Sequence, residues 1–337
     1  MKINNFDTEK KVFIIAEIGN NHEGDFSVAQ ELIGKAAESG ADAVKFQTFI
    51  PEHISGGDLI RLKKLQGFHF INEQFEKLAK LAFELGIIFF STPFDPESAR
   101  FLNTIQPVFK IASSDNDYLS FINTVAGFGK PMIVSSGMAE LVQIDNVCQE
   151  VHKVWSEKNI NPGLALLHCV SSYPTPPEQA NLNAITTLKK QFPEQIIGYS
   201  DHTLGIQAAV SSVALGARIV EKHFTLDKNY SDFHDHQISA DPEDLKQMIE
   251  NIREVELMLG TGEKILQKNE KEIRVALRRS VAASRNLQIG DILTKDDIIW
   301  IRPGTGITMG KENQIIGKRL SRPLSYCELI SLEDVDA

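Results

Sequence analysis

Short apolar runs alternate with longer amphipathic stretches along most of the chain. Runs such as 12–17 (VFIIAE) and 164–169 (LALLHC) have no polar alternation, which is typical of strands buried on both faces of a parallel sheet. Between the runs, apolar residues recur at helical spacing, and Gly40 supplies a stop after the first such stretch. The expected strands are 12–17, 42–49, 87–91, 108–112, 132–135, 164–169, 196–199 and 218–223. The expected helices are 26–39, 73–85 with Asn72 as cap, 95–105, 118–128, 141–158, 182–191, 204–215 and 241–259.

This series of strand–helix units predicts the fold of the larger part of the chain. Eight units in about 250 residues have the length of a (β/α)8 barrel. A doubly wound open sheet is the alternative, but eight nearly uniform repeats favour closure. We therefore predict an α/β protein with a TIM barrel over residues 1–262.

The pattern changes after Gly260. Residues 263–276 are charged and poor in large apolar side chains, which predicts a linker. Residues 277–337 contain short β-like runs at 280–283, 298–302 and 317–320, separated by turns. This is typical of a small β-rich domain, and about 60 residues support only a limited core. We expect this domain to dock on the barrel or on a second subunit.

Composition and charge exclude several classes of protein. No apolar signal-peptide core follows Met1, and no apolar run approaches the roughly 18 residues of a membrane span. Three widely separated cysteines, Cys148, Cys169 and Cys327, indicate a reducing compartment, so we expect a cytoplasmic protein. The net charge of −10 argues against a nucleic-acid surface, whereas local lysines can still bind a small anion.

Polar side chains collect at the carboxyl ends of the expected strands, where a barrel places its active site. Any one of them is explained equally well by local pairing or packing. Together they indicate a ligand site, because buried ionised groups settle where a counter-charge is available. The set is Glu17, Lys45, Gln47, Ser91, Thr92, Lys110, Ser113, Ser135, Ser136, His168, Ser171, Tyr173, Ser200, Asp201, His202, Glu221, Lys222 and His223.

Two lysines in this set, Lys45 and Lys110, predict an anion site. Hydroxyl donors lie at neighbouring strand ends, at Thr92, Ser113, Ser135 and Ser200. Two ammonium groups suit a ligand with both a phosphate and a carboxylate, which favours phosphoenolpyruvate over a neutral molecule. The alternative is that the lysines only pair with Glu17 and Glu221.

His202 and His223 end adjacent strands, so their imidazoles can meet at one metal ion. Two imidazoles with open positions suit Mn²⁺, with Co²⁺ or Mg²⁺ as alternatives, and no cysteine pair supports a closed zinc site. Alternatively, His202 only orients Asp201. The adjacent Ser200, Asp201 and His202 do not form a hydrolase triad, which needs residues from separate segments. Cys169 has no evident activating partner and is expected to be a packed thiol.

Nine stretches of the sequence resemble the bacterial sialic acid synthases and their relatives. They occur in the family's order and cover nearly the whole chain. They are residues 14–25 (IIAEIGNNHEGD), 40–49 (GADAVKFQTF), 89–95 (FFSTPFD), 110–115 (KIASSD), 131–138 (PMIVSSGM), 166–178 (LLHCVSSYPTPPE), 196–206 (IIGYSDHTLGI), 213–228 (VALGARIVEKHFTLDK) and 301–306 (IRPGTG).

The resemblance implies a TIM barrel followed by an antifreeze-like (SAF) domain, in a homodimer whose small domain reaches the partner's active site. It implies condensation of phosphoenolpyruvate with N-acetylmannosamine, or a related N-acyl hexosamine, and water to give N-acetylneuraminate and phosphate. The implied phosphoenolpyruvate contacts are Lys45, Thr92, Lys110, Ser113, Ser135 and Ser200. His202 and His223 match metal ligands, and Glu17 matches a carboxylate beside the reacting centre. The implied sugar contacts are Gln47, Tyr173 and Asp235, with Arg302 directed to the N-acyl group.

Three departures from the family pattern lie on the acceptor side. Asp115 stands at a substrate-binding position where better-known bacterial members carry Glu, and Ser171 stands where some members carry Asn. Residues 50–71 do not match the sugar-covering loop. N-acetylmannosamine, its 6-phosphate and the 2,4-diacetamido-trideoxy hexose of N,N'-diacetyllegionaminate synthesis therefore all stay open as acceptors. The AEIGNNH stretch resembles the pseudaminate branch less.

Two other functions compete with this one. A Schiff-base aldolase would use Lys45 or Lys110 as its amine nucleophile. A sugar-binding or ice-binding module led by the C-terminal domain would leave the polar strand ends unexplained.

Overall fold

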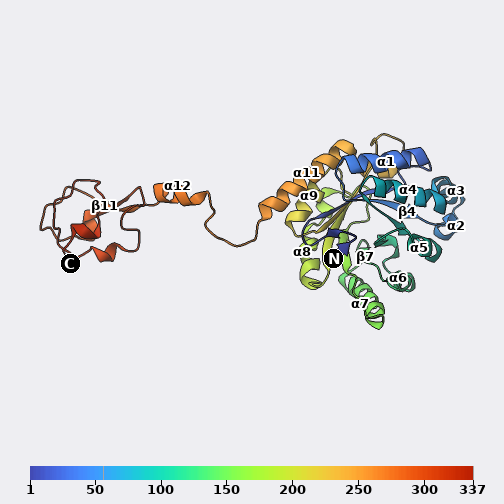
Figure 1. Ribbon diagram of the computed structural model, residues 1–337, viewed down its shortest axis with the longest axis horizontal. Helices are drawn as coiled ribbons and strands as arrows, with labels where there is room; N and C mark the ends of the chain where they lie inside the picture. The colour runs from blue at the N-terminus through green and yellow to red at the C-terminus, as the bar shows by residue number, and fades with distance from the viewer. Residues whose placement is uncertain (56, 337) are drawn as a thin grey trace. The chain divides into compact units, whose positions relative to one another are not determined.

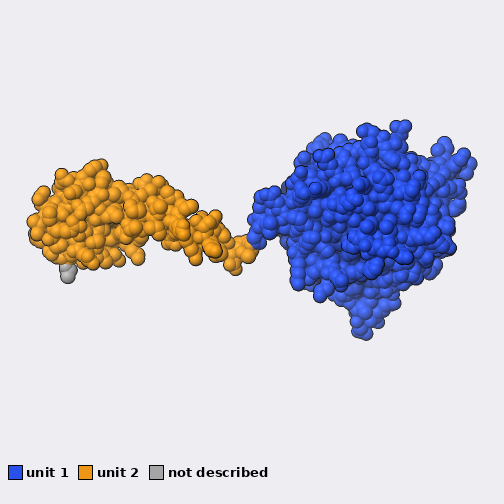
Figure 2. Space-filling model, turned by 45° about the horizontal axis from the view of Figure 1, so that its top comes forward, with its two compact units in different colours: residues 1–260 blue, residues 261–337 orange. Residues whose placement is uncertain are grey.

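The computed structural model describes residues 1–55 and 57–336. The chain forms two compact units, residues 1–260 and 261–337, which Figure 2 shows in different colours. Each unit has its own hydrophobic core. No helix among the described residues is both long enough and apolar enough to cross a membrane.

The first unit is built on eight parallel strands that form a nearly closed barrel (Figure 1). Pairing of β10 with β3 joins the late strands to the early ones, and β5 and β6 end the series. Between these two, the side chain of Gln106 accepts a hydrogen bond from the Ser91 amide at 2.8 Å. The predicted barrel is confirmed, and the open doubly wound sheet is not what forms. The strands are β3 (Phe13–Gly19), β4 (Ala43–Thr48), β5 (Ile88–Pro93), β6 (Phe109–Ile111), β7 (Met132–Ser135), β8 (Leu164–Cys169), β9 (Ile196–Asp201) and β10 (Ile219–His223).

Eight helices connect or follow these strands and pack on the outside of the barrel (Figure 1). Asp25 caps the first helix by accepting hydrogen bonds from Ser27 and Val28, and Gly40 adopts a φ of 90° just beyond its end. The expected cap at Asn72 is wrong, because the Gln74 side chain binds the Ile71 amide and makes Ile71 the cap. The helices are α1 (Phe26–Glu38), α4 (Asn72–Glu84), α5 (Pro96–Leu102), α6 (Leu119–Ala126), α7 (Leu141–Glu157), α8 (Asn183–Gln191), α9 (Gln207–Ala214) and α11 (Pro242–Leu259).

The barrel interior is filled below the strand ends by large apolar side chains. Phe13, Phe90, Ile133 and Leu167 belong to one buried cluster. A short hairpin of β1 (Lys2–Ile3) and β2 (Phe6–Asp7) places the fully buried Ile3 in the same cluster. The hairpin, which the sequence pattern did not reveal, therefore packs against the amino-terminal half of the interior, and space for a ligand lies at the carboxyl ends.

Two long loops at the carboxyl ends contain helices of their own. The loop after β4 holds α2 (Pro51–Ile54) and α3 (Leu59–Phe68), and the loop after β10 holds α10 (His234–Ile238). The rings of Phe68 and Phe233 lie 5.2 Å apart, and both belong to a small cluster that includes Phe49. The two loops are therefore packed together.

The first helix of the second unit is α12 (Glu270–Leu277). It forms within the charged stretch 263–276, which had predicted only a linker. Strand β11 (Ser280–Ala283) pairs antiparallel with β12 (Ile298–Ile301). The run at 317–320 makes isolated bridges, at Arg319 and Leu320, instead of a strand.

Two segments of this unit repeat the same contacts. Arg285 binds Asp297 (Nε to Oδ1, 2.9 Å), and Arg322 binds Asp334 in the matching way. The backbones of Leu287 and Leu324 exchange hydrogen bonds with each other at 2.8 and 3.0 Å. These ion pairs and backbone hydrogen bonds stabilise a small unit that has little regular strand.

Candidate active site

A cavity of about 240 Å³ lies at the carboxyl ends of the barrel strands, and all eight strands or the loops directly after them contribute to its wall. We call it the central cavity. Glu221 and Ser171 from the expected set at the strand ends line it. So do eleven of the fourteen residues to which the resemblance gives a role: Glu17, Lys45, Gln47, Thr92, Lys110, Ser113, Ser135, Tyr173, Ser200, His202 and His223.

Three of the residues to which the resemblance gives a substrate-binding role do not line the central cavity. Asp115 ends a short 3-10 turn after β6, and burial raises the pKa of its carboxyl. Asp235 lies in α10, with Oδ2 at 3.8 Å from Nδ1 of His223. Arg302 belongs to the second unit, where its Nε donates to the Leu277 carbonyl at 3.0 Å.

Lys45 is paired with two carboxylates inside the cavity. Its Nζ lies 2.7 Å from Oε2 of Glu17 and 3.6 Å from Oε2 of Glu221. The pairing that the sequence offered as the alternative to an anion site is thus present for Lys45. It does not exclude a ligand, because Lys45 also lines the cavity and donates to Thr92 Oγ1 at 3.0 Å.

The two carboxyl groups differ in pKa. Burial raises the pKa of Glu17 to about 7, against the opposing charge of Lys45. Burial acts in the same direction on Glu221, but the charges of Lys110 and Lys45 outweigh it and lower the pKa of Glu221 to about 2. Glu17 is therefore suited to exchange a proton near neutral pH, whereas Glu221 stays ionised.

Lys110 is the cation without a close carboxylate. Its Nζ donates to Ser135 Oγ at 2.6 Å and to the Ile111 carbonyl at 3.0 Å. In the described part of the chain, no carboxylate oxygen lies within 4.0 Å of this nitrogen. Burial lowers the pKa of Lys110, so an anionic ligand would stabilise its charged form.

The hydroxyl of Ser113 is held in place by the turn after β7. The Gly137 amide donates to Ser113 Oγ at 3.2 Å. A β-carbon at Gly137 would lie 2.5 Å from that oxygen, so only glycine permits this approach. The turn thereby fixes one of the hydroxyl groups of the predicted anion site.

The imidazoles of His202 and His223 face each other with ring centroids 5.4 Å apart. Nδ1 of His202 contacts the Val170 carbonyl at 2.8 Å, which leaves Nε2 as the nitrogen available to a ligand. Nδ1 of His223 is buried and has no hydrogen-bond partner among the described residues. Burial also lowers the pKa of His223 to about 3, so its ring stays in the neutral form that binds metals.

Asp201 and Lys222, which we expected at the mouth of the barrel, do not line the central cavity. They pair with each other at 3.0 Å. In the described part of the chain, no side-chain hydrogen bond or ion pair joins His202 to Asp201. Side chains alternate along a strand, so residues between Ser200 and His202, or between Glu221 and His223, face the opposite side.

Cys169 does line the cavity, contrary to our expectation of a packed thiol without a partner. Its Sγ lies 3.5 Å from Ser113 Oγ and 3.8 Å from Nδ1 of His202. Burial acts to raise the pKa of the thiol, but the neighbouring His202 outweighs it, so the pKa is lowered. Cys169 is two residues after Leu167 on β8, so the two side chains face the same way. Because Leu167 points into the barrel interior, this alternation would have predicted that Cys169 does too. Glu221, which was in the expected set at the strand ends, lies on the same face of β10 as His223 and lines the cavity as well. Other lining residues that sequence reasoning missed are Phe94, Ser114 and Met138.

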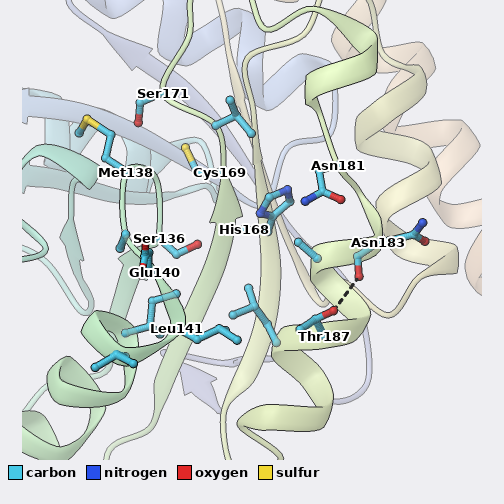
Figure 3. A pocket seen from close by; sticks show the side chains of 16 residues that line it. Ser136, Met138, Glu140, Leu141, His168, Cys169, Ser171, Asn181, Asn183 and Thr187 are labelled. Atoms are coloured by element: carbon cyan, nitrogen blue, oxygen red, sulfur yellow. Dashed lines mark hydrogen bonds between the residues drawn. The ribbon is translucent and has the colours of Figure 1, made fainter.

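A second cavity, of about 840 Å³, adjoins the central one between the loop after β7 and helix α8 (Figure 3). The two cavities share Met138, Cys169 and Ser171. His168, which we expected at the central mouth, lies here beside Asn181 and binds the Ala180 carbonyl through Nε2 at 2.9 Å. Ser136 lines this second cavity as well.

A barrel with two lysines, two imidazoles and a carboxyl pair around one pocket belongs to the class of enzymes that act on small anionic substrates. Residues 32–264 match the NeuB family, and residues 278–336 match the SAF domain. The chain therefore belongs to the NeuB family of sialic or nonulosonic acid synthases and carries a C-terminal SAF domain.

Several relatives cover almost the whole chain. An uncharacterized protein of Methanocaldococcus jannaschii is 44% identical, over 96% of this chain and 94% of its own length. N,N'-diacetyllegionaminic acid synthase of Legionella pneumophila is 38% identical (96% and 95%), and human N-acetylneuraminate-9-phosphate synthase is 36% identical (96% and 92%). The crystal structure of N-acetylneuraminic acid synthetase from Leptospira borgpetersenii aligns with a TM-score of 0.76 at 35% identity, covering 81% of this chain and 94% of that one. Family membership thus defines the type of reaction, while the relatives differ in the product they are named for.

Proposed function

We propose that this protein condenses phosphoenolpyruvate with the open-chain aldehyde of an N-acyl amino hexose and water, forming a nine-carbon sialic-acid-type sugar and phosphate. The observation that carries the proposal is that Lys45, Lys110, His202 and His223 all face one cavity of about 240 Å³. The first acceptor candidate is N-acetylmannosamine, which would give N-acetylneuraminate.

The donor half of the cavity suits phosphoenolpyruvate. Lys45 and Lys110 supply two positive charges for its phosphate and carboxylate, and among the described residues Lys110 has no carboxylate oxygen within 4.0 Å. Further donors are the hydroxyls of Thr92, Ser113, Ser135 and Ser200. Charge and hydrogen-bond donors are thus fixed before the substrate binds, which favours catalysis by preorganisation.

His202 and His223 fit a divalent metal ion, with Mn²⁺ favoured and Co²⁺ or Mg²⁺ as alternatives. The buried, unpartnered Nδ1 of His223 and the tautomer fixed on His202 support this assignment. Among the described residues, no group of three or more His, Cys, Asp and Glu side chains is arranged to hold a metal, so water or substrate oxygens would complete the coordination. A cation bound there would act as a Lewis acid toward the acceptor's carbonyl oxygen.

The chemistry then follows from charge and proton placement. C3 of phosphoenolpyruvate bonds to the aldehyde carbon with the electron pair of its double bond, which leaves C2 electron-poor. Water adds to C2, and the C2–O bond to phosphate then breaks. The proton of the C2 hydroxyl leaves with the phosphate, as hydrogen phosphate, and a ketone forms. Glu17 accepts the proton of the water and returns one to the new sugar oxygen, as its pKa of about 7 permits. Holding both substrates in one pocket lowers the entropic part of the barrier.

On the acceptor side, we propose that Gln47 and Tyr173 contact the sugar from the cavity wall. Asp115 and Asp235, which lie just outside that wall, are proposed to meet the parts of a longer acceptor that extend beyond it. We also propose a homodimer in which Arg302 of one subunit's SAF domain reaches the N-acyl group in the other subunit's barrel.

A second acceptor candidate is a 2,4-diacetamido-trideoxy hexose. It is favoured by two relatives named N,N'-diacetyllegionaminic acid synthase, from Legionella pneumophila and Campylobacter jejuni, at 38% and 35% identity.

The test is to incubate the protein with phosphoenolpyruvate, Mn²⁺ and a panel of three sugars: N-acetylmannosamine, its 6-phosphate and the 2,4-diacetamido-trideoxy hexose. Product masses and kcat/KM identify the acceptor. Failure to release phosphate with any N-acyl hexosamine would contradict the proposal. Trapping of a pyruvate imine by borohydride would instead support the aldolase.

A further inference from the structure

We infer that the ion pair of Asp201 and Lys222 is a positioning device that fixes the two imidazoles of the central cavity from outside that cavity. This inference rests on the proposed metal site at His202 and His223. Neither member of the pair lines the cavity, and both side chains are almost completely buried, at 0% and 1% exposure.

The pair lies directly behind the imidazoles. Asp201 and Lys222 are opposite each other in the parallel pairing of β9 with β10. His202 follows Asp201 in the chain, and His223 follows Lys222. Each member of the ion pair is therefore the residue directly before one proposed metal ligand. The 3.0 Å contact between Nζ and Oδ2 therefore ties together the two backbones that carry the imidazoles.

The same pair also holds the residue beyond His202. Oδ1 of Asp201 accepts hydrogen bonds from the amide of Thr203 at 2.9 Å and from its hydroxyl at 2.8 Å. Lys222 donates to the Thr203 carbonyl at 2.6 Å. Since Asp201 and Thr203 flank His202, both of its neighbours in the chain are fixed at the point where the strand ends.

Both carboxylate oxygens of Asp201 accept hydrogen bonds in this network. The hydroxyl of Tyr199 gives Asp201 a further hydrogen bond at 3.1 Å, so neither carboxylate oxygen is left without a partner. A buried ion pair is often replaceable by apolar side chains without loss of stability. Apolar side chains, however, make no directional hydrogen bonds. A histidine that binds a metal needs its ring held within a narrow range of positions, which such hydrogen bonds can provide.

The test compares Mn²⁺ binding by calorimetric titration in wild type, Lys222→Met and Asp201→Asn, with melting temperatures measured on the same samples. We expect Mn²⁺ affinity to fall at least tenfold in both variants. We also expect kcat to recover at saturating Mn²⁺, which a general loss of structure would not produce. Arg253→Met is the matched control. It breaks the contact of Arg253 with Asp42, just before β4, and should change the melting temperature without changing Mn²⁺ affinity.

Wild-type Mn²⁺ affinity in both Lys222→Met and Asp201→Asn would overturn the inference. If these variants do not fold, Thr203→Val removes only one hydrogen bond and should still weaken Mn²⁺ binding several-fold, and unchanged binding there would also overturn it. Wild type that binds no Mn²⁺, or binds it no better than His223→Ala, would remove the proposed metal site and this inference with it. The two failures are therefore distinguishable.

Discussion

The carboxylate of Glu17 lies 2.7 Å from the ammonium group of Lys45 inside the central cavity, where both side chains are at most 5% exposed. Glu17 can exchange a proton near neutral pH, and Lys45 would bind the negative charge of phosphoenolpyruvate. The contact joins these two groups. The proton-transfer and anion-binding parts of the proposed reaction are thus in direct contact before any substrate arrives.

Glu17 should set the pH dependence of the reaction. Burial raises its pKa to about 7, and below that pH the carboxyl is protonated and does not accept a proton from water. We expect kcat/KM to fall as the pH drops through about 7 and to level off above it. Glu17→Gln should lower kcat by about 10² to 10⁴ and remove this limb of the profile. The exposed Glu84→Gln is the control, and an unchanged acid limb in Glu17→Gln would assign the limb to another group.

The two lysines should respond differently to removal of their charge. Lys110→Met should weaken phosphoenolpyruvate binding by about 100-fold, a loss equivalent to about 2.7 kcal/mol. It should lower the melting temperature less than Lys45→Met does, because among the described residues no carboxylate oxygen lies within 4.0 Å of Lys110. Lys45→Met should destabilise the fold by about 3 kcal/mol, since Glu17 and Glu221 lose their buried partner. Calorimetry and thermal unfolding measure both effects. Equal stability losses in the two variants would contradict the assignment.

The proposed exchange of SAF domains predicts complementation between inactive variants. In a mixture of His223→Ala and Arg302→Ala proteins, each mixed dimer should contain one intact site, formed by an unaltered barrel and an unaltered SAF domain. After subunit exchange we expect about a quarter of wild-type activity from an equal mixture, given random pairing into twofold dimers. Activity no greater than that of the separate variants would show that Arg302 serves its own barrel or no barrel.

The second unit offers a test of backbone strain. Cys327 has a φ of 65° at the turn that matches Gly290, whose φ is 89°. Cys327→Gly should stabilise the unit by about 0.5 to 1 kcal/mol, because glycine adopts this conformation without a steric penalty. Hydrogen exchange of core amides such as those of Val281 and Leu287 measures the change. Cys327→Ala keeps the β-carbon and should give no gain; equal gains in both would mean that the thiol, and not the backbone, is responsible.

Strands with a continuous apolar pattern could be predicted almost to the residue. Met132–Ser135 and Leu164–Cys169 have the bounds that the pattern gave. The two-residue strands of the N-terminal hairpin and helix α10 were missed, because elements so short carry no period of their own. Contacts distant in sequence hold them, such as Ile3 within the barrel core and Phe233 against Phe68.

The site was predictable to the extent that parallel topology brings all strand ends to one mouth. The prediction was wrong where it depended on which way a side chain points, since every second residue of a strand faces away from the barrel interior. Lys222 was expected in the cavity and lies behind it, whereas Cys169 was expected to be packed and lies in the wall. Arg302 lies outside the reach of such reasoning, because the role that we propose for it depends on a second subunit.

The central claim is that a metal ion and phosphoenolpyruvate occupy one cavity, and ³¹P relaxation of phosphoenolpyruvate in the presence of Mn²⁺ tests it most directly. A cavity of about 240 Å³ would keep the phosphorus close to Mn²⁺ at His202 and His223. We predict strong broadening of the ³¹P signal with protein and Mn²⁺, and none beyond the protein-free level when Mg²⁺ replaces Mn²⁺ or when both histidines are changed to Ala. Bound phosphoenolpyruvate with no paramagnetic broadening, or equal broadening in the double variant, would contradict the account.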